Sequence, residues 1–425
     1  MKIVMMTNTF TPIVGGLERS VMAFADEYRK KGHRVLIVAP AFEKVPQHER
    51  GVIRIPAIQN FNGSDFSVQL PLPEILTETL NRFHPDIIHS HHPFLIGDTA
   101  LRVSAKYRAP LVFTHHILFE QNTHYVFGDS EAAKRFVVEL STGYANLADQ
   151  VFAPSESIRT LLLERGVKTT VEVVPTGIYP EKFVRGNGTA IRKSFKIPAR
   201  AFVAGYIGRL APEKNLEFLA RAVSSFLNRK QDAHFLVVGE GPLEESMKTI
   251  FAERGVSERS HFAGVLKGKQ LIHAYHALDI FAFSSQSETQ GLVLTEAMAS
   301  GVPVVAVDAP GVREVVKDGE NGRLLSRENE RKFSEALYAC SAWSPQEKQK
   351  FKQAALKTAK GFSMHEWGER ALEIYKRLLL KEYLVRPTSG SSWEIAQERI
   401  KTELRLAVNF TKAAAAVVTK GGIKD

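Results

Sequence analysis

Short apolar runs alternate with helix-compatible stretches along most of the chain, and this alternation limits the possible folds more than any other feature. Runs rich in Val, Ile, Leu and Phe predict buried strands, each followed by a candidate helix. The predicted strands span residues 2–7, 34–39, 86–90, 111–114 and 150–153 in the first half, and 202–208, 234–238, 279–284 and 302–307 in the second. Strands separated by helices pair in parallel, with helices on both faces of the sheet. The sequence therefore predicts an α/β protein with two doubly wound, Rossmann-like domains.

The length of the chain fits this division, because 425 residues suit two domains of about 150 to 200 residues better than one core. The alternation pauses at residues 181–200, where glycines and a proline interrupt the periodicity, and this stretch is predicted to be a linker. We expect an N-terminal domain at residues 1–180 and a C-terminal domain at residues 201–362, which face each other across a cleft. A helix at residues 363–385 is expected to cross back to the first domain.

The last segment, residues 386–425, is predicted to be a basic amphipathic tail that lies outside both cores. A helix is expected from residue 393 to about residue 418. Its expected apolar face consists of Ile395, Ile400, Leu404, Ala407, Val408 and Phe410, with Arg399, Lys401, Arg405 and Lys412 beside it. Such a helix either lies in a membrane interface or docks on a protein surface, and the sequence leaves both alternatives open.

Charge and composition narrow the possible partners. The formal net charge is +10, from 56 Lys and Arg against 46 Asp and Glu, which suits a polyanionic partner. Nucleic acid is disfavoured because no nucleic-acid-binding motif accompanies the charge, which leaves phosphates and an anionic membrane surface. Neither a signal-peptide pattern nor an apolar run of membrane-spanning length is recognised, so we expect a cytoplasmic protein, peripheral on the inner face of the cell membrane. Cys340, the single cysteine, is expected to be a buried helix residue.

The strongest candidate site follows the predicted strand at residues 279–284. There a loop containing Glu288 and Gly291 opens into a helix that carries Glu296. Loops at the carboxyl ends of parallel strands are where α/β folds bind ligands, and amides at a helix start receive phosphate oxygens. Phosphate is expected at Gln290, Gly291, Leu292 and Val293. The two carboxylates flank that position and suit the hydroxyl groups of sugars.

This Glu-x7-Glu spacing resembles that of the group-1 (family 4) retaining glycosyltransferases of GT-B architecture, over roughly residues 1 to 380. The resemblance implies that Glu288 contacts the donor sugar, that Glu296 contacts the nucleotide ribose and that the loop between them holds the diphosphate. It also implies a nucleoside-diphosphate sugar as the donor substrate, of the UDP-sugar or GDP-sugar type, with no obligatory metal or other cofactor. Asp-x-Asp, typical of the metal-dependent alternative architecture, does not occur in the sequence.

Further candidates follow other strands of the second half. Arg209 and Lys214 come after the strand at residues 202–208 and match the Arg/Lys pair of the family. Two cations there would neutralise a diphosphate and stabilise the departing nucleoside diphosphate. Gly239 and Gly241 form a turn beside the expected nucleotide in the family, although ordinary strand-to-helix turn chemistry explains them almost as well.

In the first half, Gly15 and Gly16 follow the first strand, where the family places a glycine pair over the donor phosphates. His116 lies two residues after the strand at residues 111–114 and matches the family's Thr-x-His pattern. The match implies a contact with the donor sugar near the bond that breaks. His115 is expected to point the other way.

Three histidines, His89, His91 and His92, lie at the end of the predicted strand at residues 86–90 or directly after it. A metal site is disfavoured because neighbouring strand-end residues point in different directions and no carboxylate lies at ligand spacing. A wall of the acceptor pocket is the alternative. The run at residues 92–97, together with the aromatic stretch at residues 119–127, resembles members that glycosylate diacylglycerol.

The sequence thus predicts a retaining glycosyltransferase that moves a hexose from a UDP-glucose or GDP-mannose type of donor to a hydroxyl of a membrane lipid, such as diacylglycerol or phosphatidylinositol. The alternatives are a soluble or polysaccharide acceptor and a sugar-nucleotide-binding protein without transfer activity. The expected catalytic residues are His116, Glu288, Arg209 and Lys214.

Overall fold

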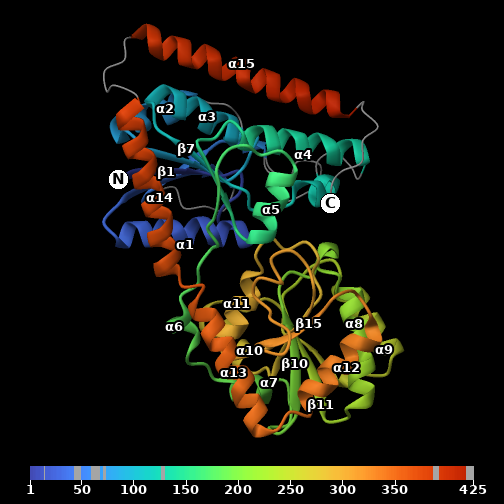
Figure 1. Ribbon diagram of the computed structural model, residues 1–425. Helices are drawn as coiled ribbons and strands as arrows, with labels where there is room; N and C mark the ends of the chain where they lie inside the picture. The colour runs from blue at the N-terminus through green and yellow to red at the C-terminus, as the bar shows by residue number, and fades with distance from the viewer. Residues whose placement is uncertain are drawn as a thin grey trace. The chain divides into compact units, whose positions relative to one another are not determined.

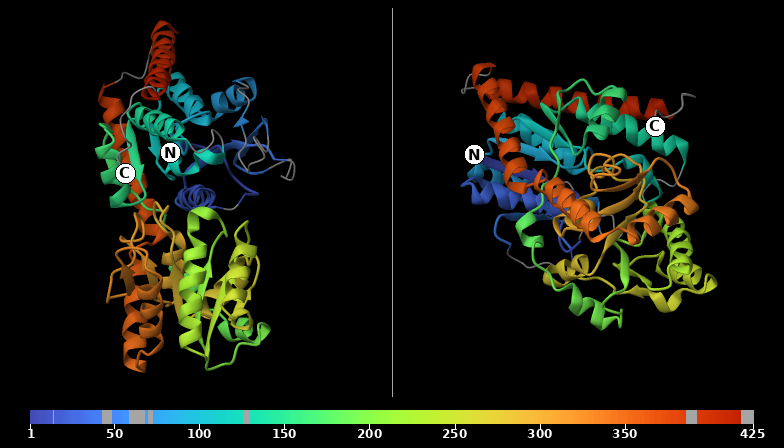
Figure 2. Two further views of the ribbon diagram at one scale, coloured as in Figure 1. Left: turned by 90° about the vertical axis from the view of Figure 1, so that its right-hand side faces the viewer. Right: turned by 60° about the horizontal axis from the view of Figure 1, so that its bottom comes forward.

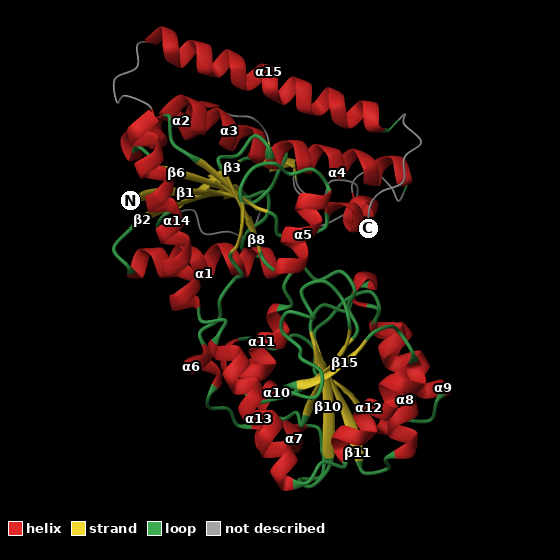
Figure 3. Cartoon of the chain, viewed as in Figure 1, coloured by secondary structure: helices red, strands yellow, loops and turns green. Residues whose placement is uncertain are grey.

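A computed structural model describes residues 1–13, 15–42, 49–58, 68–69, 73–125, 130–385 and 392–417. The chain forms two compact units, one of Met1–Gly177 with Met364–Asp425 and the other of Ile178–Ser363 (Figure 1). Each unit is a parallel sheet covered by helices on both faces, which confirms the predicted α/β class with two Rossmann-like domains (Figure 3).

The first unit contains a seven-stranded sheet in the order β3-β2-β1-β6-β7-β8-β9. Its strands are β1 (Lys2–Met6), β2 (Arg34–Pro40), β3 (Val52–Ile55), β6 (Ile87–Ser90), β7 (Leu111–Thr114), β8 (Gln150–Ala153) and β9 (Val171–Val173), with a separate hairpin of β4 (Ala57–Ile58) and β5 (Val68–Gln69). Its helices are α1 (Gly16–Lys30), α2 (Pro73–Phe83), α3 (Ile96–Tyr107), η2 (Phe119–Tyr125), α4 (Glu131–Ala145), α5 (Glu156–Glu164), α14 (Met364–Val385) and α15 (Ser392–Ala416). The chain order reverses between β1 and β6, so the loops after these strands border the switch point where open α/β sheets bind ligands.

The second unit contains a six-stranded parallel sheet in the order β12-β11-β10-β13-β14-β15. Its strands are β10 (Phe202–Ile207), β11 (Ala233–Val238), β12 (Ser260–Phe262), β13 (Ile280–Phe283), β14 (Val304–Val307) and β15 (Gly322–Leu325). Its helices are α6 (Pro180–Phe183), α7 (Gly188–Ser194), η3 (Pro212–Lys214), α8 (Leu216–Arg229), α9 (Glu244–Glu253), η4 (Ser257–Arg259), α10 (Gly268–His276), α11 (Leu292–Ala299), α12 (Glu330–Ser341) and α13 (Pro345–Lys360). Here the switch point lies between β10 and β13, the strands that precede Lys214 and Glu288.

The sheet interiors explain why the long apolar runs became central strands. Every residue of β10 and of β13 is buried, because helices cover both faces. Tyr206, Phe281 and Phe283 stack their rings in the core of the second unit. The edge strands β9, β12 and β15 are short and partly exposed, and none of them was predicted from the sequence.

Residues 181–200 differ from the predicted linker. They carry most of α6 and all of α7, and they belong to the second unit. The Asn187 side chain caps α7 by accepting a hydrogen bond from the Ala190 amide at 3.0 Å. A Cβ on Gly186 would lie 2.2 Å from the His276 ring, and one on Gly188 would lie 2.1 Å from the His276 carbonyl oxygen. These glycines therefore permit close packing on α10, where the sequence suggested a change of domain.

The two C-terminal helices belong to the first unit. The Tyr375 hydroxyl of α14 lies 2.6 Å from Nδ1 of His89 and 3.3 Å from the Tyr28 hydroxyl of α1. Helix α15 lies along α3 and α4, as Figure 1 and both views of Figure 2 show in red beside blue-green helices. Among the described residues, no helix combines the length and the apolar character required to cross a bilayer.

Candidate functional site

The loop between β13 and α11 forms the first candidate site, at the carboxyl edge of the second sheet. Gly291 adopts a left-handed conformation (φ 74°) as the residue that caps the start of α11. A Cβ at Gly291 would lie 2.8 Å from Leu294 Cδ1, and a side chain would also strain this backbone. The first amides of a helix have no carbonyl partner within that helix. The start of α11, at Leu292 and Val293, therefore offers amide donors to a phosphate.

Lys214 and Glu288 meet at this edge. The Lys214 ammonium lies 2.6 Å from Glu288 Oε1, and both side chains are mostly buried. The Ser284 hydroxyl donates to the carbonyl oxygens of Lys214 and Asn215, at 3.0 Å each. These bonds tie the end of β13 to the loop after β10, so residues 74 positions apart in the sequence form one ion pair.

Arg209 lies on the same loop after β10 and is more exposed than Lys214. Its guanidinium pairs with Glu213, while the Tyr206 hydroxyl donates to the Arg209 carbonyl at 3.1 Å. The Ser287 hydroxyl donates to the Glu213 carbonyl at 3.1 Å. The loop that carries Arg209 is thus held against the loop that carries Glu288.

Glu296 has a different environment from Glu288. It is buried within α11, and the Tyr275 hydroxyl donates a 2.9 Å hydrogen bond to its Oε2. Tyr275, at the end of α10, is itself fully buried. The sequence did not indicate Tyr275, because it sits on the apolar face of an ordinary amphipathic helix.

Gly239 and Gly241 have a structural explanation. Both have positive φ angles, and a Cβ on Gly239 would lie 1.9 Å from the Gly208 carbonyl oxygen. A Cβ on Gly241 would lie 2.5 Å from the Leu210 carbonyl oxygen, while the Leu210 amide donates to the backbone carbonyl oxygen of Glu240 at 2.9 Å. The turn that contains Gly239 and Gly241 therefore packs directly on the backbone at Gly208 and Leu210. Because a side chain at either glycine would prevent this packing, the two glycines support the segment that carries Arg209.

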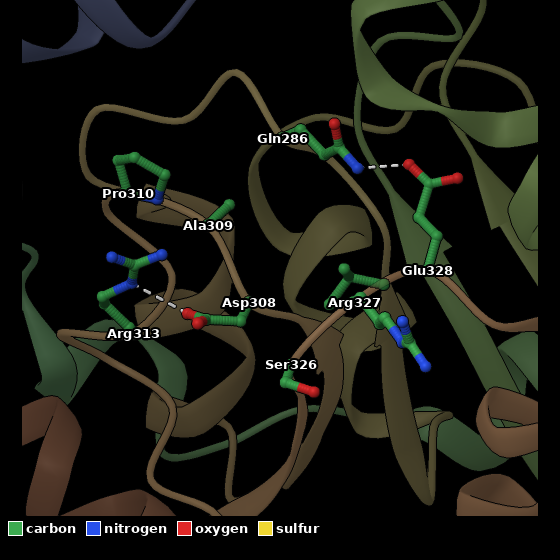
Figure 4. Close-up of a pocket in the computed structure, with 9 residues that line it drawn as sticks. Gln286, Asp308, Ala309, Pro310, Arg313, Ser326, Arg327 and Glu328 are labelled. Atoms are coloured by element: carbon green, nitrogen blue, oxygen red, sulfur yellow. Dashed lines mark hydrogen bonds and ion pairs between the residues drawn. The ribbon is translucent and has the colours of Figure 1, made fainter. Parts of the chain in front are cut away.

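A pocket of about 430 Å³ lies where β14 and β15 end. Figure 4 shows Gln286 and Glu328 directed toward each other across it, and Arg313 directed toward Asp308. The loop after β14, which lines this pocket, continues to Gly311 and packs closely on the predicted phosphate position. A Cβ on Gly311 would lie 2.5 Å from the Gln290 amide nitrogen. No predicted site residue lines this pocket, and the sequence carried no signal for it because its lining comes from three separate loops.

In the first unit, histidines from two neighbouring strand ends form a buried cluster. Nδ1 of His91 lies 2.8 Å from Nε2 of His116, and the two rings stack. His89 stacks on His91 and bonds Thr114 Oγ1 through Nε2 at 2.6 Å. His92 accepts a hydrogen bond from the Asn8 amide at 3.1 Å. The structure thus joins the predicted catalytic His116 to the histidines that were assigned to an acceptor wall.

These imidazoles are neutral at physiological pH. Burial lowers the pKa of His89 and of His92 to about 3. Burial, reinforced by the neighbouring histidines, holds the pKa of His91 and of His116 well below the ordinary value. A neutral imidazole donates through one nitrogen and accepts through the other, so one of His91 and His116 donates in their contact and the other accepts, which couples their tautomers. Within the described residues, no group of three acidic, histidine or cysteine side chains is arranged to hold a metal ion.

His115 lies away from His91, among aromatic rings. Its ring meets those of Phe113 and Phe119 edge-on, with centroids 6.0 and 5.5 Å away. Neither ring nitrogen bonds any residue that the structure describes. Burial lowers its pKa to about 3, with a further contribution from Arg165.

Gly15 and Gly16 begin α1 after β1. A Cβ on Gly15 would lie 2.6 Å from Glu18 Oε2, whereas a Cβ on Gly16 would meet nothing within 4 Å. The buried Glu18 carboxylate accepts a hydrogen bond from the Thr9 hydroxyl. Gly15 thus leaves room for Glu18, and Gly16 leaves open space beside the helix start.

Residues 126 and 127 of the predicted acceptor stretch at residues 119–127 lie outside the described residues.

Comparison with known proteins assigns the chain to a family. Residues 14–182 match the model described as Glycosyltransferase Family 4, and residues 187–358 match the model described as Glycosyl transferases group 1. The two matches together span most of the chain, one in each unit. The chain belongs to this family of glycosyltransferases and has the GT-B architecture.

Similar curated proteins include several glycosyltransferases. The alpha-monoglucosyldiacylglycerol synthase of Streptococcus pneumoniae is 28% identical over 80% of this chain and 83% of its own length. The GDP-mannose-dependent alpha-mannosyltransferase of Corynebacterium glutamicum is 28% identical over 81% of this chain and 80% of its own length. Among solved structures, Anabaena HepE in complex with UDP superposes with a TM-score of 0.71 at 21% identity, covering 89% of this chain and all of that one. That similarity supports the fold.

Proposed function

We propose that this enzyme is a retaining glycosyltransferase that uses a nucleoside-diphosphate sugar as donor and a hydroxyl of a membrane lipid, such as diacylglycerol or phosphatidylinositol, as acceptor. The observation that carries the proposal is the pair of Lys214 and Glu288 beside the left-handed Gly291 at the start of α11. This arrangement combines a cation and free helix amides for a diphosphate with a carboxylate for sugar hydroxyls.

In the proposed mechanism, the second unit binds the donor. The bond between the anomeric carbon and the diphosphate oxygen breaks, and charge develops on the departing diphosphate. Lys214, Arg209 and the first amides of α11 stabilise this charge without a metal ion. The acceptor oxygen bonds the anomeric carbon from the same face, and its proton leaves with the departing diphosphate, so no protein base is needed.

The remaining predicted residues bind and orient the donor. Glu288 accepts hydrogen bonds from the sugar hydroxyls, and Glu296 from the ribose. We assign to His116, whose imidazole is neutral, a contact with the sugar near the reacting carbon. Gly16 leaves backbone space for the phosphates, while Gly239 and Gly241 act through the turn that carries Arg209.

A lipid acceptor is favoured over a soluble one by two observations. Relatives in Streptococcus pneumoniae and Acholeplasma laidlawii are both named alpha-monoglucosyldiacylglycerol synthase. The net charge of +10 also favours binding to an anionic bilayer surface, and we propose that the enzyme is a peripheral protein on that surface. The second candidate acceptor is a soluble polyol phosphate, because a relative in Nocardia farcinica is named D-inositol 3-phosphate glycosyltransferase.

The test is a transfer assay with radiolabelled UDP-glucose, UDP-galactose and GDP-mannose. Each donor is offered diacylglycerol or phosphatidylinositol in vesicles, and inositol 3-phosphate in solution. We expect label in the lipid phase with one donor type, and no label with the Glu288→Gln variant. Label in inositol 3-phosphate alone would establish the second candidate. Inverted anomeric configuration in the product would refute retention.

A further inference from the structure

Helix α15 docks on the first unit through a face of mixed polarity, on which Leu406 packs against the hydrophobic core of that unit. The Asn409 side chain donates to the Leu140 carbonyl of α4 at 3.1 Å. This approach requires Gly143, because a Cβ there would lie 1.6 Å from Asn409 Oδ1. Arg102 of α3 forms a bidentate ion pair with Glu403, at 2.6 and 3.0 Å. The buried residues of the described part of α15 are Thr402, Asn409 and Ala413, which recur at helical spacing.

The docking leaves an apolar stripe on the opposite side of α15. Ile400, Leu404 and Val408 follow one another at intervals of four residues and are between 52% and 61% exposed. Phe410, predicted for the same face, lies instead at the flank toward α4, where its ring meets that of Phe136. A globular protein rarely exposes large apolar side chains in a continuous row unless a partner covers them. The side chain of Ile395, predicted for the same face, lies outside the described part of the structure.

Cations line the long edge of this stripe. Lys401, Arg405 and Lys412 lie on one side of it, as their helical spacing from Ile400 and Leu404 requires. The structure describes two acidic side chains on the helix, and both are engaged, Glu403 with Arg102 and Glu398 with Lys401. Among the described residues, Arg405 and Lys412 form no ion pair. The outward face of α15 therefore combines exposed apolar side chains with uncompensated positive charge.

We propose that the outward face of α15 is a membrane-docking surface, which holds the first unit on an anionic lipid bilayer with the helix axis parallel to the membrane plane. An interfacial helix buries an apolar face at the headgroup boundary, and cations beside that face meet anionic headgroups. This inference deepens the proposed function, which places the acceptor in a membrane, and names the element that reaches it.

Charge disfavours a second copy of the chain as the occupant. Two α15 helices packed stripe to stripe would bring the cations at their edges together, and the two acidic side chains that the structure describes on this helix are already paired. An anionic bilayer satisfies both the apolar and the charged part of the surface.

The test is co-sedimentation of the full-length protein with vesicles of phosphatidylcholine alone and of equimolar phosphatidylcholine and phosphatidylglycerol. These vesicles contain neither diacylglycerol nor donor, so the result does not depend on whether transfer occurs. We expect binding to the anionic vesicles, weakened by added salt. The Ile400→Gln/Leu404→Gln/Val408→Gln variant should bind roughly tenfold or more weakly.

Two controls isolate the surface. The variant Leu163→Gln/Val184→Gln/Val265→Gln alters equally exposed apolar residues elsewhere and should bind as the wild type does. Arg405→Gln/Lys412→Gln should weaken binding to anionic vesicles, whereas Lys348→Gln/Lys350→Gln on α13 should not. All substituted residues are exposed, so unfolding midpoints should match that of the wild type.

Unchanged binding of the α15 triple variant would overturn the inference, even if lipid glycosylation were demonstrated. Absence of wild-type binding to both vesicle types would also overturn the inference. A wild-type protein that is dimeric, with a monomeric triple variant, would identify a second copy of the chain as the occupant. Vesicle binding that depends on α15, in an enzyme that glycosylates only soluble acceptors, would refute the lipid acceptor and leave the docking surface intact.

Discussion

The hydroxyl of Tyr275 donates a 2.9 Å hydrogen bond to Oε2 of Glu296, and both side chains are buried in the second unit. A buried carboxyl group requires such a partner, because a buried polar group left without its hydrogen bond costs about 1–3 kcal/mol. The bond also holds the Glu296 carboxylate in one orientation. Tyr275 thus positions Glu296, which the proposed function assigns to the donor ribose.

We therefore predict that Tyr275→Phe lowers the free energy of unfolding by about 1–3 kcal/mol and weakens nucleoside-diphosphate binding. Urea unfolding and calorimetric titration with UDP and GDP measure the two effects. The half-buried Tyr338, which lies on α12 of the same unit, provides the control Tyr338→Phe. Unchanged nucleotide affinity in a destabilised Tyr275→Phe variant would show that Glu296 needs no such support for binding.

Replacing Lys214 should weaken nucleotide binding. Loss of a charge-assisted contact to phosphate predicts roughly ten- to hundredfold weaker binding of the nucleoside diphosphate for Lys214→Gln. The matched control is Arg221→Gln, since Arg221 pairs with Glu330 at the same 2.6 Å elsewhere in the second unit. Calorimetric titration in low and high salt measures both variants. Equal affinities would remove Lys214 from the phosphate site.

The buried histidines predict that acid destabilises the first unit. His115 stays neutral in the folded protein because burial lowers its pKa to about 3, whereas it gains a proton in the unfolded chain below its ordinary value. Stability is therefore lost as the pH falls below about 6.5, and each such histidine costs about 1.4 kcal/mol at pH 5.5.

His115→Phe tests this linkage, because an aromatic ring in the same place cannot bind a proton. We expect the difference in unfolding free energy between pH 7.5 and pH 5.5 to shrink by about 1.4 kcal/mol. Urea unfolding at the two pH values measures it. The control His84→Asn alters an exposed histidine of the same unit and should preserve the wild-type difference. If His115→Phe showed the same difference in unfolding free energy between the two pH values as the wild type, the loss of stability in acid could not be assigned to His115.

The contact between Gly143 and Asn409 predicts a non-additive pair of substitutions. Gly143→Ala places a methyl group against the Asn409 side chain, and this overpacking should destabilise the first unit by about 1–3 kcal/mol. It should also speed proteolytic release of α15. Adding Asn409→Ala removes the clash, and the alanine in α4 then favours the helix by about 0.5–1 kcal/mol relative to glycine. Additive effects of the two substitutions would contradict the docking geometry.

Much of the architecture was already present in the local sequence. Buried strands are continuous apolar runs, so the central strands of both sheets were located to within one or two residues. The edge strands escaped prediction because a half-exposed strand needs no such run. The linker at residues 181–200 was wrong for a related reason, since Gly186 and Gly188 indicate a loop in sequence and close packing in the fold.

The same division holds for the candidate site. The spacing of Glu288 and Glu296 and the positions of Lys214 and Arg209 after a strand are local features, and the sequence determined them. Tertiary structure alone decided that Lys214 pairs with Glu288, that Tyr275 bonds Glu296 and that His91 bonds His116.

Tertiary structure also decided which face of α15 packs on the protein and which face remains exposed. Periodicity identifies the faces of a helix, but the steric fit of Asn409 against Gly143 and the packing of Leu406 on the core selected the face that docks. The physical reason is the same in each case. Patterns along the chain report burial and local conformation, whereas partners far apart in sequence are selected by packing and by the cost of burying an unpaired polar group.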